Sequence, residues 1–424
     1  MTQLKQFIGR FNDLGIKNNL LVVLTKKGFN SPTPIQYQVI PGALEGKDVV
    51  GVAQTGTGKT LAFGIPMIQR IMRSNGQGLI LVPTRELALQ VERALKGVGV
   101  SLGLRSVVIM GGASKYAQIK ALRSNPHIVV ATPGRLVDLM NQKVYSLNKV
   151  NVTIDEADRM LDIGFLPQIK RILESLPKKR QTMLFSATMP KSISSLAGDF
   201  MKMPIRIEIA PQGTLAENIE QELFVIPRNK KMRLLDSLLQ KYKKDKILIF
   251  SRTKHGAKRI ARDIRSMRHT ATEIHSNRSQ MQRKLSLEGF AKEKFRVMVA
   301  TDIAARGIDV KDISLVINFD LPNNSEDYVH RIGRTGRAGR CGKAISFVMP
   351  SQKYNVKKIE RLIRKSLPIS SLPPLPAERE KVFSKEKPYV FKRNRFSQRS
   401  RGKQNNKHRS RSRGYRAKAF RARV

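Results

Sequence analysis

The chain has 424 residues, enough for two domains of ordinary size with additional segments, and its hydrophobic share of 40% is sufficient for well-formed cores. Its net charge of +48 is extreme, and residues 391–424 alone contain 14 Lys and Arg residues and no Asp or Glu. Because positive charge is in excess in the body of the chain as well, the composition predicts a polyanionic partner. Nucleic acid is favoured, and an acidic membrane surface is the weaker alternative.

Cysteine content and the distribution of apolar residues exclude several other classes of protein. Cys341 is the single cysteine, so the chain has no internal disulfide framework and no Cys-x-x-Cys metal motif. No apolar run reaches the about 18 residues that predict a membrane-spanning helix. Residues 1–10 also lack the apolar core and cleavage pattern of a signal peptide. We therefore expect a soluble, cytoplasmic protein.

Short apolar runs alternate with helical stretches in the first half of the chain, as they do in parallel α/β units. The expected strands are 48–52, 78–82, 127–131, 151–154, 182–185 and 205–209. Several of these runs end directly in a polar or glycine-rich motif. Because ligands collect at the carboxyl ends of the strands in open α/β sheets, this placement strengthens each motif.

A second series of the same kind follows a break at residues 211–213. Its expected strands are 222–226, 246–250, 296–300, 314–318 and 343–348, with amphipathic stretches such as 231–241 and 255–266 between them. Three prolines, Pro373, Pro374 and Pro376, then stop any helix. The Arg-, Ser- and Lys-rich segment beyond residue 388 cannot bury enough apolar surface to fold alone. The pattern predicts two similar α/β domains, a short linker and a disordered basic tail.

A glycine-rich segment after the first expected strand has the composition of a phosphate-binding loop. Its residues are Ala53, Gln54, Thr55, Gly56, Thr57, Gly58, Lys59 and Thr60. The two glycines allow backbone N–H groups to curl around phosphate oxygens, and Lys59 places a positive charge near the β- and γ-phosphates. Thr60 would offer its hydroxyl to Mg²⁺.

Acidic residues follow the fourth expected strand, in the segment Asp155-Glu156-Ala157-Asp158. Asp155 would offer a carboxylate to the same Mg²⁺, directly or through water, and Glu156 would orient or deprotonate the attacking water. Upstream, the side-chain amide of Gln36 could pair with both N6 and N7 of adenine. The loop and the acidic pair together predict nucleotide hydrolysis.

Further polar motifs occur along the chain in a fixed order. They are Pro83-Thr84-Arg85-Glu86-Leu87-Ala88, Gly111-Gly112, Thr132-Pro133-Gly134-Arg135, Ser186-Ala187-Thr188, Ser251-Arg252-Thr253-Lys254, and the segments 301–309 and 330–337. With these motifs, the sequence resembles the DEAD-box ATP-dependent RNA helicases of superfamily 2 over residues 10 to 365, and most of all their bacterial RhlE-type branch.

The resemblance implies two tandem RecA-like parallel-sheet domains followed by the disordered basic C-terminal tail. The implied boundaries are 1–37 for an N-terminal segment with the adenine motif, 38–209 for the ATP-binding domain, 210–219 for the linker, 220–370 for the second domain and 371–424 for the tail.

The resemblance also implies which residues bind and hydrolyse ATP with Mg²⁺. Phe29 and Gln36 would recognise adenine, residues 53–60 would hold the phosphates, and Asp309 would lie by the ribose or the attacking water. Catalysis would fall to Lys59, Asp155, Glu156, Arg334 and Arg337, with Thr60 and Asp155 at the metal. The two arginines would reach the γ-phosphate when the domains close, where charge on the transferring group matters most. Coupling between the domains would involve Asp158, Ser186, Thr188 and His330.

An RNA path over both domains is implied in the same way. Its residues would be Thr84, Arg85, Gly112, Thr132, Gly134, Arg135, Arg252, Thr253, Thr301, Asp302 and Gly307. Hydroxyls and backbone N–H groups at such positions grip phosphate and the 2′-OH without reading bases. One position departs from the family: Ser276 follows His275 where a glycine is common, although Gln280 and Arg283 still match.

The expected activity is RNA-stimulated ATP hydrolysis coupled to local unwinding of short RNA duplexes or remodelling of ribonucleoproteins by a monomer with no membrane partner. The tail interleaves Phe391, Phe396, Tyr415 and Phe420 with cations, which suits RNA binding without sequence preference. An RNA-annealing chaperone and a DNA helicase are the alternative functions. The RNA itself stays open among ribosomal RNA in ribosome assembly, mRNA in decay, and targets in cold adaptation.

Overall fold

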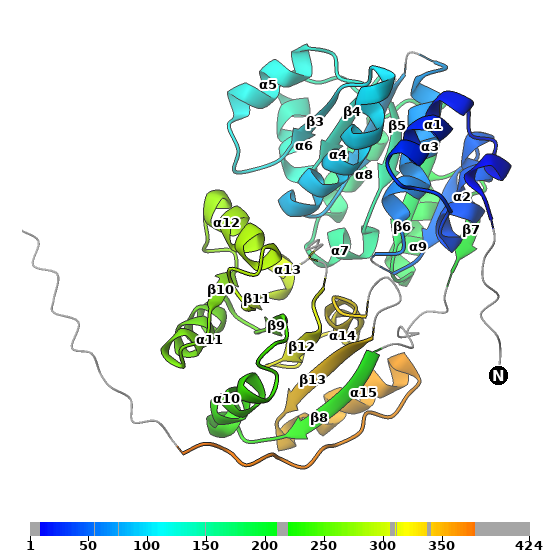
Figure 1. The fold of residues 1–424 in the computed structure, drawn as a ribbon. Helices are drawn as coiled ribbons and strands as arrows, with labels where there is room; N and C mark the ends of the chain where they lie inside the picture. Colours follow the sequence, from blue (N-terminus) through cyan, green and yellow to red (C-terminus); the bar gives the residue numbers. More distant parts are fainter. Residues whose placement is uncertain are drawn as a thin grey trace, which may run out of the picture. The chain divides into compact units, whose positions relative to one another are not determined.

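The computed structural model describes residues 9–54, 56–74, 76–148, 150–209, 219–305, 310, 312–336 and 341–377. They form two parallel sheets with helices on their faces (Figure 1). Residues 9–209 are called the first lobe below, and residues 219–377 the second lobe. Within the described residues, no helix is long and apolar enough to cross a membrane.

The first lobe contains a seven-stranded sheet in the order β3-β4-β2-β5-β6-β1-β7, and all of its strand pairs are parallel. The strands are β1 (Val49–Val52), β2 (Gln77–Leu81), β3 (Ser106–Ile109), β4 (Ile128–Ala131), β5 (Val150–Ile154), β6 (Thr182–Ser186) and β7 (Ile205–Glu208). The central strands are apolar runs without alternation because helices cover both faces of the sheet.

The helices of the first lobe divide between the two faces. They are η1 (Phe11–Leu14), α1 (Asn18–Lys26), α2 (Pro34–Leu44), α3 (Lys59–Ile71), α4 (Arg85–Gly99), η2 (Val100–Leu102), α5 (Lys115–Arg123), α6 (Pro133–Asn141), α7 (Ala157–Asp162), α8 (Leu166–Glu174) and α9 (Lys191–Phe200). Helices α1–α4 pack with Val49 and Phe185 on one face, and α5–α9 pack with Val50 and Leu184 on the other. Successive strand residues thus serve opposite cores.

The second lobe repeats this design around a six-stranded parallel sheet in the order β10-β11-β9-β12-β13-β8. Its strands are β8 (Ile219–Val225), β9 (Ile247–Phe250), β10 (Ala271–Ile274), β11 (Val297–Ala300), β12 (Leu315–Asn318) and β13 (Gly342–Val348). Its helices are η3 (Arg228–Lys230), α10 (Lys231–Lys241), α11 (Lys254–Ser266), α12 (Gln280–Ala291), α13 (Asp302–Ala305), α14 (Ser325–Ile332), η4 (Pro350–Gln352) and α15 (Lys353–Ile363). Helices α10 and α11 share one core, and α12 and α13 share another.

The proline-rich segment after α15 contacts the second lobe. Arg233 Nε on α10 donates a 2.7 Å hydrogen bond to the carbonyl oxygen of Pro376, and Ser237 Oγ donates one of 3.3 Å to that of Pro374. The sequence assigned the disordered tail to begin at residue 371, but residues 371–377 are placed by the structure, and 374–376 contact α10. The aromatic and basic residues expected to hold RNA, 391–424, lie outside the described residues.

Candidate functional site: a nucleotide site between two lobes

The predicted phosphate loop connects β1 to α3 and requires glycine at its end. Gly56 and Gly58 have φ values of 87° and 93°, a left-handed conformation that side chains disfavour. A Cβ atom on Gly58 would lie 2.5 Å from Gln36 Nε2. Thr57 Oγ1 closes the loop with a 2.8 Å hydrogen bond to the carbonyl oxygen of Gln54. Thr55 lies outside the described residues.

Gln36, at the start of α2, is joined to this loop. Its Oε1 accepts a 2.9 Å hydrogen bond from Thr33 N, and its Nε2 donates one of 3.0 Å to the carbonyl oxygen of Gly58. Phe29, the other residue expected at adenine, is 40% exposed. The amide of Gln36 therefore sets the position of the loop, and an exposed aromatic ring precedes it in the chain.

Lys59 and Asp155 form the buried, charged part of the site. Lys59 Nζ donates a 3.0 Å hydrogen bond to the carbonyl oxygen of Ala53. Burial raises the pKa of Asp155 to about 6, an effect that the charge of Lys59 opposes and that of Glu156 adds to. A nearly inaccessible carboxylate with an unfavourable charge is a suitable ligand for a hard cation such as Mg²⁺, which proteins commonly hold through one or two carboxylates and the phosphates of a substrate. Thr60, the other expected ligand, is the second residue of α3.

Glu156 has a left-handed backbone, with φ of 55°, at the start of α7. Its backbone N–H donates a 3.0 Å hydrogen bond to Asp155 Oδ1, so the two acidic residues are held together. Its Oε2 lies 3.6 Å from Arg159 Nε and accepts no hydrogen bond from the described residues. This buried carboxylate oxygen therefore has hydrogen-bonding capacity that the described residues do not use.

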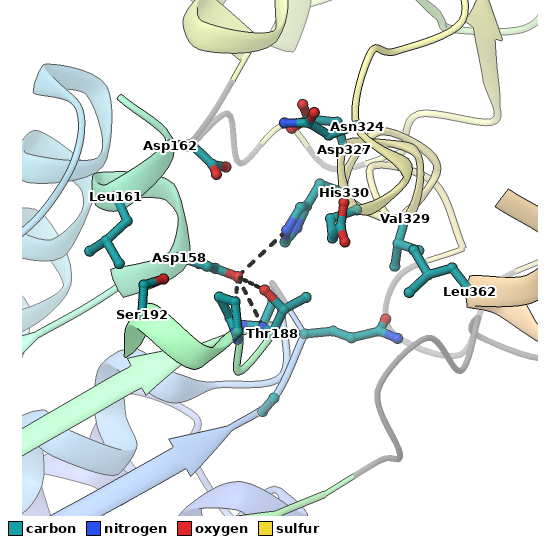
Figure 2. Close-up of a pocket in the computed structure, with 16 residues that line it drawn as sticks. Asp158, Leu161, Asp162, Thr188, Ser192, Asn324, Asp327, Val329, His330 and Leu362 are labelled. Carbon is teal, nitrogen blue, oxygen red and sulfur yellow. Dashed lines mark hydrogen bonds and ion pairs between the residues drawn. The ribbon is translucent and has the colours of Figure 1, made fainter. Parts of the chain in front are cut away.

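Asp158 ties together the ends of two strands and contacts the second lobe. Its Oδ2 accepts hydrogen bonds from Ala187 N (3.1 Å), Thr188 N (2.9 Å) and Thr188 Oγ1 (3.0 Å). Its own N–H donates to Ser186 Oγ at 3.2 Å. His330 Nε2 on α14 lies 3.6 Å from the same carboxylate oxygen (Figure 2). The structure thus brings together all four residues expected to couple the lobes.

The ionisation of this pair follows from its surroundings. Burial opposes charge on Asp158, but the hydrogen bond to His330 and the charges of Arg159 and Lys59 outweigh it and hold its pKa well below the usual range. Burial and the charge of Arg159 lower the pKa of His330, although the hydrogen bond to Asp158 and the charges of Asp158 and Glu156 oppose this shift.

A cavity of about 360 Å³ adjoins this contact, and both lobes line it. Ala53, Gln54 and Thr188 contribute from the first lobe, and Asn324, His330 and Gly333 from the second. Figure 2 shows that the Asp158 and His330 side chains meet at its wall. Arg334, one of the two expected arginine fingers, is buried, and its Nε donates a 3.3 Å hydrogen bond to the carbonyl oxygen of His330. Arg337, Asp309 and Gly307 lie outside the described residues.

Sequence reasoning missed the role of Arg331, which is 2% exposed. Its Nε and Nη2 donate to the two carboxylate oxygens of Asp302 at 2.5 and 2.8 Å, and its Nη1 donates to Asn318 Oδ1 at 3.1 Å. Asp302, expected on the RNA path, is thus engaged by an arginine of its own lobe. No local signal distinguishes this anchor, because Arg331 lies in a segment that also contains His330 and Arg334.

The remaining residues expected at RNA follow strand ends in both lobes. Thr84 and Thr253 cap α4 and α11, accepting hydrogen bonds from Leu87 N (3.3 Å) and Gly256 N (3.0 Å). Thr132 precedes α6, Gly134 is exposed in its first turn, and Thr301 follows β11. These positions share the carboxyl edges of the two sheets.

Arginines concentrate where the two lobes adjoin. Arg85 lies against Gly112, where a Cβ atom would be 2.0 Å from its Nη1, and Arg135 Nη1 donates to the carbonyl oxygen of Ala113 at 3.3 Å. Burial lowers the pKa of Arg85, and the charges of Arg283 and Arg135 add to this effect. Across the lobes, Arg283 Nη2 donates a 2.8 Å hydrogen bond to Glu86 Oε2. In the second lobe, Arg252 Nη2 donates to the carbonyl oxygen of Leu321 at 3.4 Å.

Comparison with known proteins assigns the family. The model of the DEAD/DEAH box helicase family matches residues 33–196, and that of the helicase conserved C-terminal domain matches residues 230–339. The DEAD-box ATP-dependent RNA helicase CshA of Bacillus subtilis is 40% identical over 360 residues, 84% of this chain and 73% of its own length. The chain belongs to the DEAD-box ATP-dependent RNA helicases. A Streptococcus pneumoniae protein of the same name is 41% identical over 387 residues, 91% of this chain and 73% of its own length.

Solved structures agree with this assignment. Dbp5 of S. cerevisiae bound to RNA and ADP BeF3 has a TM-score of 0.79 at 30% identity, covering 85% of this chain and 95% of its own. Mss116 bound to single-stranded RNA and UDP-BeF has the same TM-score at 27% identity, over 86% of this chain and 79% of its own. The helicase therefore has two RecA-like parallel-sheet α/β lobes and is an ATP-hydrolysing enzyme, as the sequence predicted. The B. subtilis and S. pneumoniae relatives carry the name CshA, so the RhlE-type branch stays a prediction.

Proposed function

We propose that this RNA helicase hydrolyses ATP at the cavity between the phosphate loop and α14. Lys59 and Arg334 would stabilise negative charge on the transferring phosphoryl group, and Glu156 would orient or deprotonate the attacking water. Mg²⁺ held by Asp155 and Thr60 would neutralise phosphate charge. Gln36 and Phe29 would select adenine, and Thr55, Asp309 and Arg337 would complete the site.

The contact between Asp158 and His330 carries this proposal. It joins the residues beside Glu156, the loop after β6 and helix α14 through one buried carboxylate. ATP bound in the cavity would hold the two lobes closed, and closure would complete the RNA path along the carboxyl edges of both sheets. RNA bent along that path would no longer fit a duplex, so one strand would leave, and hydrolysis would reopen the clamp.

We also propose the RNA substrates, the cellular location and the oligomeric state of this enzyme. A relative is named CshA and two solved relatives are described as bound to RNA, which supports single-stranded RNA and short duplexes as substrates here. We expect a cytoplasmic monomer that acts on ribosome precursors or on RNA undergoing decay, with the basic tail of residues 391–424 retaining the RNA. Membership of the RhlE-type branch is part of this proposal, because the two bacterial relatives are named CshA and do not support it.

The substitution Glu156→Gln tests the assigned chemistry. Glutamine keeps the shape of the side chain but cannot accept a proton, so RNA-stimulated turnover should fall roughly 10²- to 10⁴-fold while ATP and RNA affinities change little. Steady-state ATPase assays and fluorescence titrations measure these quantities. Glu45→Gln, at an exposed ion pair with Lys47, is the matched control and should leave turnover unchanged. Turnover of Glu156→Gln at the wild-type rate would show that the role given to Glu156 is wrong.

A further inference from the structure

Helix α11 of the second lobe presents a basic surface that the nucleotide site does not use. Its inward residues, Ala257, Ile260, Ala261 and Ile264, are buried in the core that it shares with α10. Its outward residues are exposed and are here called the α11 face: Lys254, His255, Lys258, Arg259, Arg262 and Arg265. In Figure 1, α11 lies beside β10 and β11, at one end of its sheet.

Acidic residues neutralise only part of this face. Arg262 Nη2 lies 3.2 Å from Asp263 Oδ1, and Arg265 Nη1 lies 2.9 Å from Glu273 Oε2. Lys254, Lys258 and Arg259 make no ion pair with any residue that the structure describes. A positive charge density of this kind attracts a polyanion from solution.

The α11 face continues the expected RNA path. The helix begins directly after Arg252 and Thr253, both expected at RNA, and Thr253 caps it. With a rise of about 1.5 Å per residue, the face extends for roughly 16 Å beyond that point. His275 lies at the end of neighbouring β10, where burial lowers its pKa and the charges of Lys258 and His255 add to this effect. Both its ring nitrogens are buried and lack a hydrogen-bond partner among the described residues.

The chemistry of the face selects its partner. Protein interfaces depend on buried apolar or aromatic anchors, and helices that lie on membranes insert such side chains between lipids. The α11 face has none. Cationic side chains without apolar neighbours suit a phosphate backbone read without sequence preference. We infer that the α11 face binds the phosphates of RNA that extends beyond the path between the lobes. This inference rests on the RNA path proposed above and adds a second segment to it.

The triple substitution Lys258→Gln, Arg259→Gln and Arg262→Gln in the full-length chain tests the inference. The control, Lys353→Gln, Lys357→Gln and Arg361→Gln, removes the same charge from exposed positions of basic helix α15 in the same lobe. Binding of single-stranded oligouridylates of increasing length is measured over a range of salt concentrations. For long RNA, the α11 variant should lose roughly 10- to 100-fold in affinity, and its log–log salt slope should shrink by about 2. Short RNA and RNA-free ATPase should be unaffected.

Each other outcome overturns the inference. Equal losses in the α11 and α15 variants would mean that net charge alone attracts RNA. An unchanged length dependence in the α11 variant would place the additional RNA elsewhere. Weaker binding to vesicles containing anionic lipid, with RNA binding intact, would identify a membrane surface as the partner. If RNA failed to stimulate wild-type ATPase activity, the proposed RNA path itself would be wrong, whatever the α11 variant did.

Discussion

The buried carboxylate of Asp155 lowers the folding stability of the protein at neutral pH, where the proposed chemistry needs it charged. Its pKa is raised to about 6 chiefly because burial removes water from the charged form. Between the pKa of an unfolded aspartate, about 3.9, and this higher value, the folded chain binds more protons than the unfolded chain. Folding stability therefore falls as the pH rises through this window, and the charged carboxylate remains costly at neutral pH.

Replacing Asp155 with Asn should accordingly stabilise the nucleotide-free, metal-free protein. The gain should approach about 3 kcal/mol at neutral pH and shrink to roughly half of that near pH 5, where the folded carboxyl group is already mostly protonated. Urea unfolding followed by circular dichroism at several pH values measures it. ATPase activity should be lost in the same variant. A gain that does not depend on pH would mean that the stabilisation does not come from ionisation of this carboxylate.

Single residues of the site differ in how far the sequence could predict them. The sequence indicated Asp158, Ser186, Thr188 and His330 as a set because each belongs to a motif with its own signature, and the structure brings them together. The pairing of Arg331 with Asp302 could not be predicted in this way. The two residues are 29 positions apart, and only the packing of α14 against the ends of β11 and β12 places their charged groups in contact.

At the scale of elements, the two strands that the sequence did not predict lie at sheet edges. β3 and β10 are terminal in their sheets. Three of the four residues of β3 are only partly buried, and β10 contains Thr272 and Glu273. An edge strand pairs on one side only and so needs less apolar sequence than a central strand. The nine central strands were expected within a few residues because both of their faces are buried. The edge strands β7 and β8 were expected as well, although they carry exposed residues.

Helix α14 is fixed to its lobe by Arg331. Besides Asp302 and Asn318, its guanidinium bonds the carbonyl oxygen of Asp320 at 2.6 Å and stacks over Phe250 at 5.0 Å. His330 precedes it directly in the chain and lines the cavity proposed for the nucleotide, so the anchor also positions this imidazole. A buried charge that is fully paired is costly to disrupt because the partner left behind remains buried.

The substitution Arg331→Met should therefore destabilise the second lobe by about 3–5 kcal/mol. Because the chain contains no tryptophan, urea unfolding is best followed by far-ultraviolet circular dichroism. Arg361→Met, at an exposed position of α15, is the control and should change stability by less than about 0.5 kcal/mol. If Arg331→Met unfolded at the wild-type urea concentration, the bonds to Asp302 and Asn318 would contribute nothing net to the fold.

At the scale of the whole molecule, the cavity proposed for the nucleotide and the proposed RNA path both involve residues of the two lobes. His330 and Gly333 line the cavity from the second lobe, while Glu86 and Arg283 join the lobes at 2.8 Å beside the proposed RNA path. A ligand that binds at one of these two places and stabilises the closed arrangement of the lobes should therefore raise the affinity of the other place for its own ligand. Such coupling is a free energy, and it acts equally in both directions.

The substitution His330→Ala should reduce this coupling without abolishing either binding event. In the wild type, a non-hydrolysable ATP analogue should tighten RNA binding, and RNA should tighten binding of the analogue by the same factor, roughly 5- to 150-fold. Loss of the contact with Asp158 should lower both factors together, by roughly tenfold, because the carboxylate then holds only its own lobe. Asn324→Ala, which lines the same cavity without contacting Asp158, should keep the wild-type factors. If His330→Ala weakened RNA binding equally with and without the analogue, His330 would serve RNA affinity and not communication between the lobes.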